Sequence, residues 1–432
     1  MTLQDILDPV LDASWKGFPH HSPPLRRSAI GNQGWNVLRG DLPLPLAVIR
    51  RDALAGNLQW MQGFAGDHGV RLAPHGKTTM SPQLFRCQLD AGAWGLTFAT
   101  VVQLRAGVAA GVTRAIIANQ VFRAVDLQGI DDLKRDHPGL RVAFLVDSLA
   151  QLELIEAWHG AATNPQPMEL LLEIGVEGGR TGCRTHEQAL HLAQRVHAGA
   201  AAKLTGIECY EGLGATGQSG PDTAYAEALM KRVRAIAGAC DAQDLFEDDE
   251  ILLTAGGSAI FDLVADQLTM NLSRPVLGLL RSGCYVTHDH GTYHRMMNTV
   301  AQRMGCGHGL HAALEVWAAV QSCPEPGLAI LSVGKRDISY DLELPMPLGS
   351  CRAGETTMTP APADWKVAGL NDQHAYLKHA YRDGSGPEHQ ALRVGDLVAL
   401  GISHPCTTFD KWRWMPVVDE QTNICDAIVT CF

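Results

Sequence analysis

Short apolar runs alternate with longer amphipathic stretches between about residues 44 and 285. The stretches at 52–69 and 186–199, for example, carry apolar residues at helical spacing and are long enough to form crossover helices. The apolar runs predict buried strands at 45–49, 69–73, 95–99, 115–119, 142–147, 169–175, 206–210, 251–256 and 275–280.

This alternation predicts an α/β fold whose strands are parallel. Eight or nine evenly spaced units fit a closed TIM-type (β/α)8 barrel better than they fit an open sheet. No GxGxxG sequence opens the first helix, which argues against a doubly wound dinucleotide-binding sheet. We therefore expect a barrel domain over residues 44–295.

The pattern changes after about residue 300. Stretches such as 327–347 and 393–403 alternate apolar and polar residues between Pro and Gly turns, and long helical spacing disappears. This part predicts a second, mostly antiparallel β domain over residues 296–432. We expect residues 1–43 to complete it.

Composition narrows the class of protein. The chain has 432 residues, 46% of them hydrophobic, and a formal net charge of −11 without a long basic run, so we expect no nucleic-acid partner. Acidic residues near the start do not suit a signal peptide, and no segment is apolar enough to cross a bilayer, so we expect a cytoplasmic protein without a membrane partner. Its 11 cysteines form no CxxC pair, as is typical of a reducing compartment.

Reactive residue types gather just after the predicted strands, where a parallel barrel places its active site. A lysine among partly buried groups, as we expect for Lys77, has a depressed pKa, and its neutral amine can hold an aldehyde cofactor as a Schiff base. The Gly-Gly-Ser turn of Gly256, Gly257 and Ser258 allows backbone N–H groups and a hydroxyl to approach a phosphate. A lysine for an aldehyde and a turn for a phosphate together suggest pyridoxal 5'-phosphate. Further candidates after the strands are Arg180, Tyr210 and Tyr285.

Each of these residues also has a plainer interpretation. Lys77 can be a surface residue, and the turn at 256–258 can be an ordinary loop. Arg180 can pair with a neighbouring glutamate, Glu173 or Glu177, and Tyr210 can be a core residue. Their joint placement at one end of one barrel favours the functional interpretation.

A second constellation lies in GISHPCTTFDKW, residues 401–412. On an extended segment, His404 and Cys406 project to the same face and can hold one metal ion. Imidazole with thiolate favours zinc over magnesium or calcium, although another divalent metal remains open. The alternative is a buried histidine beside an inert cysteine. A rival cluster of His288, Asp289, His290 and His294 is denser but lies in a turn-like stretch, so we rank it lower.

Taken together, RLAPHGKTTMSP, EIGVEGGRTG, GIECYEG, LTAGGS, RSGCYVTHD, LSVGKRDIS and SHPCTTFDKW resemble the D-serine dehydratase and D-threonine aldolase family. These are metal-activated pyridoxal phosphate enzymes with the alanine-racemase-like fold (fold type III), a barrel followed by a β domain. The resemblance runs from about residue 44 to about residue 412. RSGCY departs from it, because close relatives often carry a proline and an asparagine there.

The resemblance implies a role for each candidate. Lys77 would be the Schiff-base lysine with His75 beside it, and Arg180 would lie near the phenolic oxygen of the cofactor. Tyr210 would lie beside the pyridine ring and Tyr285 at the ring-side turn. Phosphate would be bound by Gly256, Gly257 and Ser258, and the metal by His404 and Cys406.

Within this family, dehydratases carry His-x-Cys and aldolases carry His-x-Asp, so Cys406 favours a dehydratase. The resemblance thus implies a lyase that converts a D-β-hydroxy amino acid such as D-serine to a 2-oxo acid and ammonia. D-Threonine aldolase-type cleavage, amino-acid racemisation and a non-catalytic vitamin-carrier barrel are the alternatives. Relatives with this fold commonly pair, so we also expect a homodimer.

Overall fold

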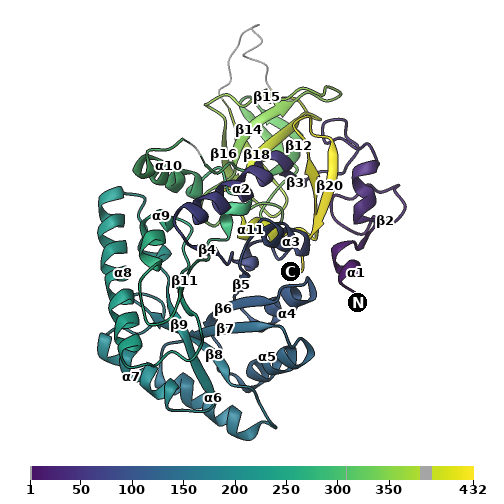
Figure 1. Cartoon of the computed structure of the whole chain (residues 1–432). Coiled ribbons are helices and arrows are strands. Elements are labelled where there is room, and N and C mark those ends of the chain that lie inside the picture. The colour runs from purple at the N-terminus through teal and green to yellow at the C-terminus, as the bar shows by residue number, and fades with distance from the viewer. Residues whose placement is uncertain (1, 308, 380–391) are drawn as a thin grey trace.

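The computed structural model describes residues 2–307, 309–379 and 392–432. Within these ranges, eight parallel strands form one sheet in the order β4-β11-β10-β9-β8-β7-β6-β5 (Figure 1). A parallel bridge between His75 and Thr97, just past β4, joins the two end strands and nearly closes the sheet into a barrel. The predicted barrel is therefore confirmed. Its strands are β4 (Arg71–Leu72), β5 (Leu96–Phe98), β6 (Arg114–Gln120), β7 (Arg141–Val146), β8 (Met168–Ile174), β9 (Ala202–Cys209), β10 (Ile251–Ala255) and β11 (Val276–Leu280).

Helices cover the outside of the barrel (Figure 1). Several begin at a serine or threonine whose side chain accepts a hydrogen bond from a backbone N–H of the first turn, as Thr100, Ser148 and Thr185 do. The barrel interior is filled by a separate small cluster of apolar side chains that includes Leu171 and Leu252. The helices are α2 (Arg51–Asp67), α3 (Pro82–Asp90), α4 (Val101–Ala109), α5 (Ala124–Asp136), α6 (Leu149–Ala161), α7 (His186–His197), α8 (Ser219–Ala242) and α9 (Phe261–Val264).

The first predicted strand, residues 45–49, lies outside the barrel. It forms β3 (Leu46–Arg50), which pairs antiparallel with β12 (Leu314–Glu325) and parallel with β19 (Trp414–Val418) in the second sheet. Its assignment as a barrel strand was therefore wrong. Four of its five residues are buried, so its apolar run looks the same in a central strand of either sheet.

The second sheet is antiparallel apart from the β3–β19 pair, as the sequence predicts. Helix α10 (Thr292–Met304) leads into it, and the short α11 (Cys406–Phe409) follows β18. Phe18 and Ile30 from the N-terminal segment share a core with Trp317 and Trp414 of this sheet. The exact domain limits at 44 and 295 stay a prediction. Its other strands are β13 (Leu328–Leu331), β14 (Met346–Cys351), β15 (Thr359–Pro360), β16 (Lys366–Leu370), β17 (Ala375–Lys378), β18 (Leu397–Gly401) and β20 (Ile424–Val429).

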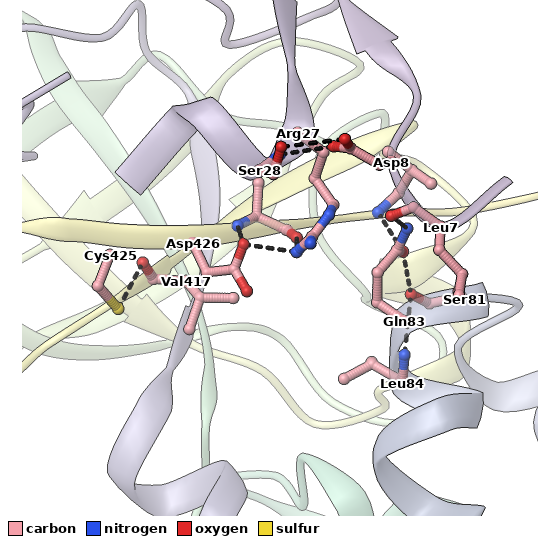
Figure 2. Close-up of polar contacts among 12 residues, drawn as sticks. Leu7, Asp8, Arg27, Ser28, Ser81, Gln83, Leu84, Val417, Cys425 and Asp426 are labelled. Carbon is pink, nitrogen blue, oxygen red and sulfur yellow. Dashed lines mark hydrogen bonds and ion pairs between the residues drawn. The ribbon is translucent and has the colours of Figure 1, made fainter. Parts of the chain in front are cut away.

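Both ends of the chain support the segment that follows Lys77. The Gln83 amide donates to the carbonyl oxygen of Leu7, in α1 (Leu3–Leu7), at 2.9 Å, and its oxygen accepts from the Val429 N–H at 3.0 Å. Figure 2 shows Gln83 between Leu7 and Ser81, with the nearby Arg27–Asp426 ion pair linking the N-terminal segment to β20. The lysine turn therefore rests on a framework built from both termini. The remaining N-terminal elements are β1 (Val10–Leu11), β2 (Leu25–Arg26) and a 3-10 turn, η1 (Arg27–Asn32).

No helix in the described ranges combines the length and the apolar character that spanning a bilayer requires.

Candidate functional site

Lys77 lies in a single 3-10 turn, η2 (Gly76–Thr78), just beyond the end of β4. The turn packs tightly on the barrel, since a Cβ on Gly76 would come within 2.8 Å of the Phe98 ring. The Lys77 side chain itself is exposed at the barrel mouth, because the turn carries it away from the packed strands. The expectation that it lies among partly buried groups was therefore wrong, whereas its placement at the strand end is confirmed.

His75 lies close to Lys77 in sequence and belongs to the bridge that nearly closes the barrel. Its ring is largely enclosed, and its Nδ1 has no hydrogen-bond partner among the described residues. Burial, followed by the positive charges of Lys77, Arg281 and Arg180, holds the pKa of His75 well below its usual range. A neutral imidazole therefore lies next to the exposed amine.

Arg180 and Tyr210 meet as the sequence predicts. The guanidinium carbon of Arg180 is 5.0 Å from the centroid of the Tyr210 ring, and both residues line a small pocket over β8 and β9. No ion pair joins Arg180 to a neighbouring glutamate in the part of the chain that the structure describes. Arg232 of α8 holds the preceding loop by donating to the carbonyl oxygen of Gly175 at 2.6 Å. The loop thus presents a cation over an aromatic ring at the barrel mouth.

A buried polar layer, which the sequence analysis missed, lies just below this pocket. Arg281, the residue after β11, forms an ion pair with Glu208 of β9 and donates to Thr254 Oγ1 of β10 at 2.9 Å. The two charged side chains are only 2% and 1% exposed. Glu173 of β8 is nearby, and burial, followed by the charge of Glu208, raises its pKa to about 7. Charged residues at the ends of apolar runs were the available signal.

The turn at 256–258 differs from its predicted role. The N–H groups of Gly256 and Gly257 donate to the carboxylate of Glu211 at 3.0 and 2.8 Å. Glu211 is fully buried, and a buried carboxylate requires such donors, so these two amides are already engaged and do not fit as phosphate donors. Ser258 is half-buried and stays a candidate. The sequence analysis missed Glu211 although it directly follows Tyr210.

Tyr285 is likewise not brought to the mouth. It is 3% exposed in the hydrophobic core, and its hydroxyl accepts a hydrogen bond from Gln88 of α3 at 3.4 Å. Burial raises the pKa of its hydroxyl. The ring therefore packs the turn after β11 against α3.

His404 and Cys406 contact each other as predicted, but the segment that carries them is helical and not extended. Pro405 adopts helical angles (φ −58°, ψ −46°), and Cys406 begins α11, so the side chains converge across a helical turn. His404 Nδ1 lies 2.5 Å from Asp341 Oδ2, a partner that the sequence analysis missed. Burial alone lowers the pKa of His404, but its hydrogen bonds to Cys406 and Asp341 outweigh that effect and raise the pKa to about 9.

Cys406 reaches the lysine turn of the barrel. Its Sγ is 3.5 Å from Thr78 Oγ1 and 3.8 Å from Cys284 Sγ. Its hydrogen bond with Cys284, together with those it shares with His404 and Thr78, outweighs burial and holds the pKa of Cys406 well below its usual range. The lysine turn and the His404–Cys406 pair therefore meet in the folded chain. Thr78 and Cys406, which form the contact, are 328 residues apart in sequence.

The rival histidine cluster has a packing role. Asp289 accepts hydrogen bonds from the N–H groups of Gly291 and His294, each at 3.0 Å, and so holds the start of α10. Burial lowers the pKa of His288 to about 3 and that of His290 to about 4. Among the described residues, no group of three or more His, Cys, Asp or Glu side chains is already placed to hold a metal ion.

The donors present fit the two expected groups to different extents. For pyridoxal phosphate, the exposed Lys77 amine, the Tyr210 ring with Arg180 and the Ser258 hydroxyl suit the cofactor, whereas the engaged amides of Gly256 and Gly257 do not. For a metal ion, a histidine held by a carboxylate beside a thiolate is a suitable donor pair. His75 Nδ1 is buried without a hydrogen-bond partner among the described residues, so it remains free to hydrogen-bond to a bound group.

Comparisons with known proteins agree with this fold. The alanine racemase N-terminal domain matches residues 49–285, and a putative serine dehydratase domain matches residues 313–418. The chain is 27% identical to D-threo-3-hydroxyaspartate dehydratase of Delftia sp. (strain HT23), covering 85% of this chain and 92% of that enzyme. It is 24% identical to 3-hydroxy-D-aspartate aldolase of Paracoccus denitrificans (strain Pd 1222), over 87% of this chain and 88% of that enzyme.

Solved structures share the same architecture. D-Threonine aldolase from Filomicrobium marinum superposes with a TM-score of 0.74 at 22% identity, over 92% of this chain and 97% of that one. A cysteine-to-alanine mutant of D-threo-3-hydroxyaspartate dehydratase, solved in the metal-free form, superposes with a TM-score of 0.67 at 22% identity, over 90% of this chain and 98% of that one. Because the alanine racemase N-terminal domain spans more than half of the sequence and the serine dehydratase domain follows it, the chain belongs to the D-serine dehydratase-like, fold type III family of pyridoxal phosphate enzymes.

Proposed function

We propose that this protein is a pyridoxal phosphate- and zinc-dependent lyase that converts a D-β-hydroxy amino acid to a 2-oxo acid and ammonia. One observation carries the proposal. Cys406 Sγ lies 3.5 Å from Thr78 Oγ1, so the donor pair of the β domain adjoins the turn that presents Lys77. An ion held by that pair would be next to the amine, where a substrate can contact both.

Lys77 is the residue suited to hold the cofactor, because its amine is exposed at the end of a rigid, glycine-dependent turn. Pyridoxal phosphate, when bound, supplies an aldehyde for an amine and a ring that stabilises negative charge on the substrate α-carbon. The Lys77 amine at the barrel mouth would serve as the base that accepts the substrate α-proton. Arg180 and Tyr210 offer a cation and an aromatic face on the same side of the mouth.

His404 and Cys406 would hold the metal ion. Asp341 occupies Nδ1 of His404, so Nε2 is the ring nitrogen left for a ligand. A zinc ion held there would supply a Lewis acid that weakens the bond from carbon to the substrate β-hydroxyl, which is otherwise a poor leaving group. Thr78, in contact with Cys406 Sγ, keeps the thiolate aligned toward the barrel.

Retro-aldol cleavage is the second candidate function. The family resemblance associates His-x-Cys, the pattern at 404–406, with dehydratases, whereas the Paracoccus relative is an aldolase. Both reactions act on D-β-hydroxy amino acids and use the same groups. The difference is whether the β-hydroxyl leaves or loses its proton while the bond between the α- and β-carbons breaks.

A product assay separates the candidates. Purified protein loaded with pyridoxal phosphate is incubated with D-serine, D-threonine and D-threo-3-hydroxyaspartate, and with their L-isomers, with and without zinc. A dehydratase releases ammonia and a 2-oxo acid, an aldolase releases glycine and an aldehyde, and a racemase interconverts isomers even after chelation. Release of glycine and aldehyde alone would overturn the dehydratase proposal in favour of the aldolase.

A second experiment tests the lysine. Borohydride reduction of the loaded protein followed by peptide mapping should find the cofactor on Lys77. Lys77→Ala should abolish both the labelling and the activity, while Lys231→Ala, at an exposed position on α8, should change neither. Labelling at another lysine in the wild-type protein would contradict the assignment.

A further inference from the structure

Cys284 is the barrel side chain that reaches the donor pair of the β domain. It follows β11 in the RSGCY turn, is 6% exposed, and places its Sγ 3.8 Å from Cys406 Sγ. The approach depends on Gly283, because a Cβ there would come within 2.6 Å of the His75 carbonyl oxygen and 2.8 Å of Thr78 Oγ1. The turn carrying Cys284 is therefore packed directly onto the turn carrying the lysine.

The separation of the two sulfur atoms fits a shared zinc ion. With zinc–sulfur bonds of about 2.3 Å and a tetrahedral angle, two thiolates on one ion lie about 3.8 Å apart. The observed distance is 3.8 Å. A disulfide would require about 2.0 Å, so the pair is not arranged as a bond.

The donor count points the same way. Catalytic zinc sites typically have three protein ligands and keep the fourth position for water or substrate. His404 and Cys406 supply only two ligands, and no set of three donors is already assembled among the described residues, so a third donor would have to join them when the ion binds. Cys284 is the remaining metal-binding side chain in contact with Cys406 among the described residues, and one histidine with two cysteines is a known catalytic ligand set.

We propose that Cys284 is the third protein ligand of the metal ion. The inference rests on the proposed function, because it concerns the zinc that function requires. On binding, the thiol proton of Cys284 passes to solvent, and two thiolates then balance the charge of Zn²⁺. One coordination position remains for the substrate hydroxyl. The ion also joins the turn after β11 of the barrel to α11 of the β domain, so metal binding couples the two parts of the chain.

The plain alternative is that Cys284 only donates a hydrogen bond to Cys406. X-ray absorption at the zinc edge separates the two, because sulfur at about 2.3 Å is distinguished from nitrogen and oxygen at about 2.0 Å. The full-length protein is kept reduced, loaded with pyridoxal phosphate and given one equivalent of zinc. Two sulfur ligands are expected in the wild type and one in Cys284→Ser and in Cys406→Ser.

Cys323→Ser is the matched control, since Cys323 is an exposed cysteine on β12 of the β domain, and it should keep two sulfur ligands. Zinc affinity, measured by competition with a chromophoric chelator, should weaken at least about tenfold in Cys284→Ser and be unchanged in Cys323→Ser. Circular dichroism of the metal-free variants verifies folding, and Cys284→Ala provides a second test if the serine variant fails to fold.

The outcomes separate this inference from the proposed function. One sulfur ligand in the wild type, or two in Cys284→Ser, overturns the role of Cys284 and leaves a two-ligand zinc lyase intact. Failure of the wild type to bind zinc refutes the metal requirement of the proposed function, and the inference with it. Two sulfur ligands in the wild type and one in each of the two variants supports the inference.

Discussion

Replacing Arg281 by methionine should be among the most destabilising single changes in the barrel. The guanidinium spans three adjacent strands at their carboxyl ends, from its own position after β11 to Thr254 on β10 and Glu208 on β9. Methionine keeps most of the volume but removes the charge. Glu208, which is 1% exposed, would be left without its counterion.

The magnitude follows from this burial. Breaking a buried ion pair by removing one partner costs about 3–5 kcal/mol, because the remaining charge is desolvated and unpaired. Thr254 also loses the hydrogen bond that Arg281 donates at 2.9 Å. With a urea m-value of about 3 kcal/mol per molar or more, this loss should lower the midpoint of urea unfolding by roughly 1 M. Removing both charges with Arg281→Met and Glu208→Leu should restore most of the loss.

The assay is urea unfolding followed by circular dichroism and tryptophan fluorescence. Arg86→Met is the matched control, since Arg86 forms an exposed pair with Asp90 on α3 and should change the free energy of unfolding by no more than about 1 kcal/mol. A loss of less than about 1 kcal/mol in Arg281→Met would contradict the stabilising role of this ion pair. So would a double variant as unstable as the two single losses added together.

Three further predictions concern the mouth and its supports. Burial and the Glu208 charge raise the pKa of Glu173 from its ordinary 4.5 to about 7 in the native protein, so between these pH values the native state keeps a proton that the unfolded state has lost. The free energy of unfolding should therefore fall by up to about 3 kcal/mol between pH 5 and pH 8 because of this residue. Urea unfolding of Glu173→Gln across this range should lack that part of the decrease. An equal decrease in the wild type and in Glu173→Gln would contradict the prediction. Gln83→Ala leaves the Val429 N–H and the Leu7 carbonyl oxygen of α1 without this partner. Urea unfolding should therefore show a decrease of about 3 kcal/mol in the free energy of unfolding. A decrease below about 1 kcal/mol would argue against a supporting role of Gln83. Asp341→Asn removes the charge that orients His404, so zinc affinity in chelator competition should fall roughly 10- to 100-fold, and unchanged affinity would exclude that role.

The two domains contribute to the candidate site in different ways. The barrel supplies the amine and the aromatic ring from the ends of its strands, whereas the β domain supplies the donor pair from the turn between β18 and α11. Contacts such as Cys406 to Thr78 and Val429 to Gln83 hold these parts together. Substitutions at these contacts should therefore affect metal binding and stability together.

The barrel and the location of most candidate residues could be predicted from the amino-acid sequence. Periodicity reports burial on each element, and in a parallel barrel every strand end faces the same opening, so Lys77, Arg180 and Tyr210 could be placed there in advance. The HPC segment was also recognisable from donor chemistry alone. These features depend on local spacing, which a chain displays without any knowledge of its partners.

The partner of each group, in contrast, depends on how distant segments pack in the folded molecule. A fully apolar run is compatible with either sheet, so the position of β3 depended on its pairing with β12 and β19. The capture of two glycine amides by Glu211 and the approach of Cys284 to Cys406 join segments that are 46 and 122 residues apart. Such contacts depend on packing across the whole molecule. Periodicity in the sequence predicts whether a residue faces the core, but it does not predict which residue it contacts there.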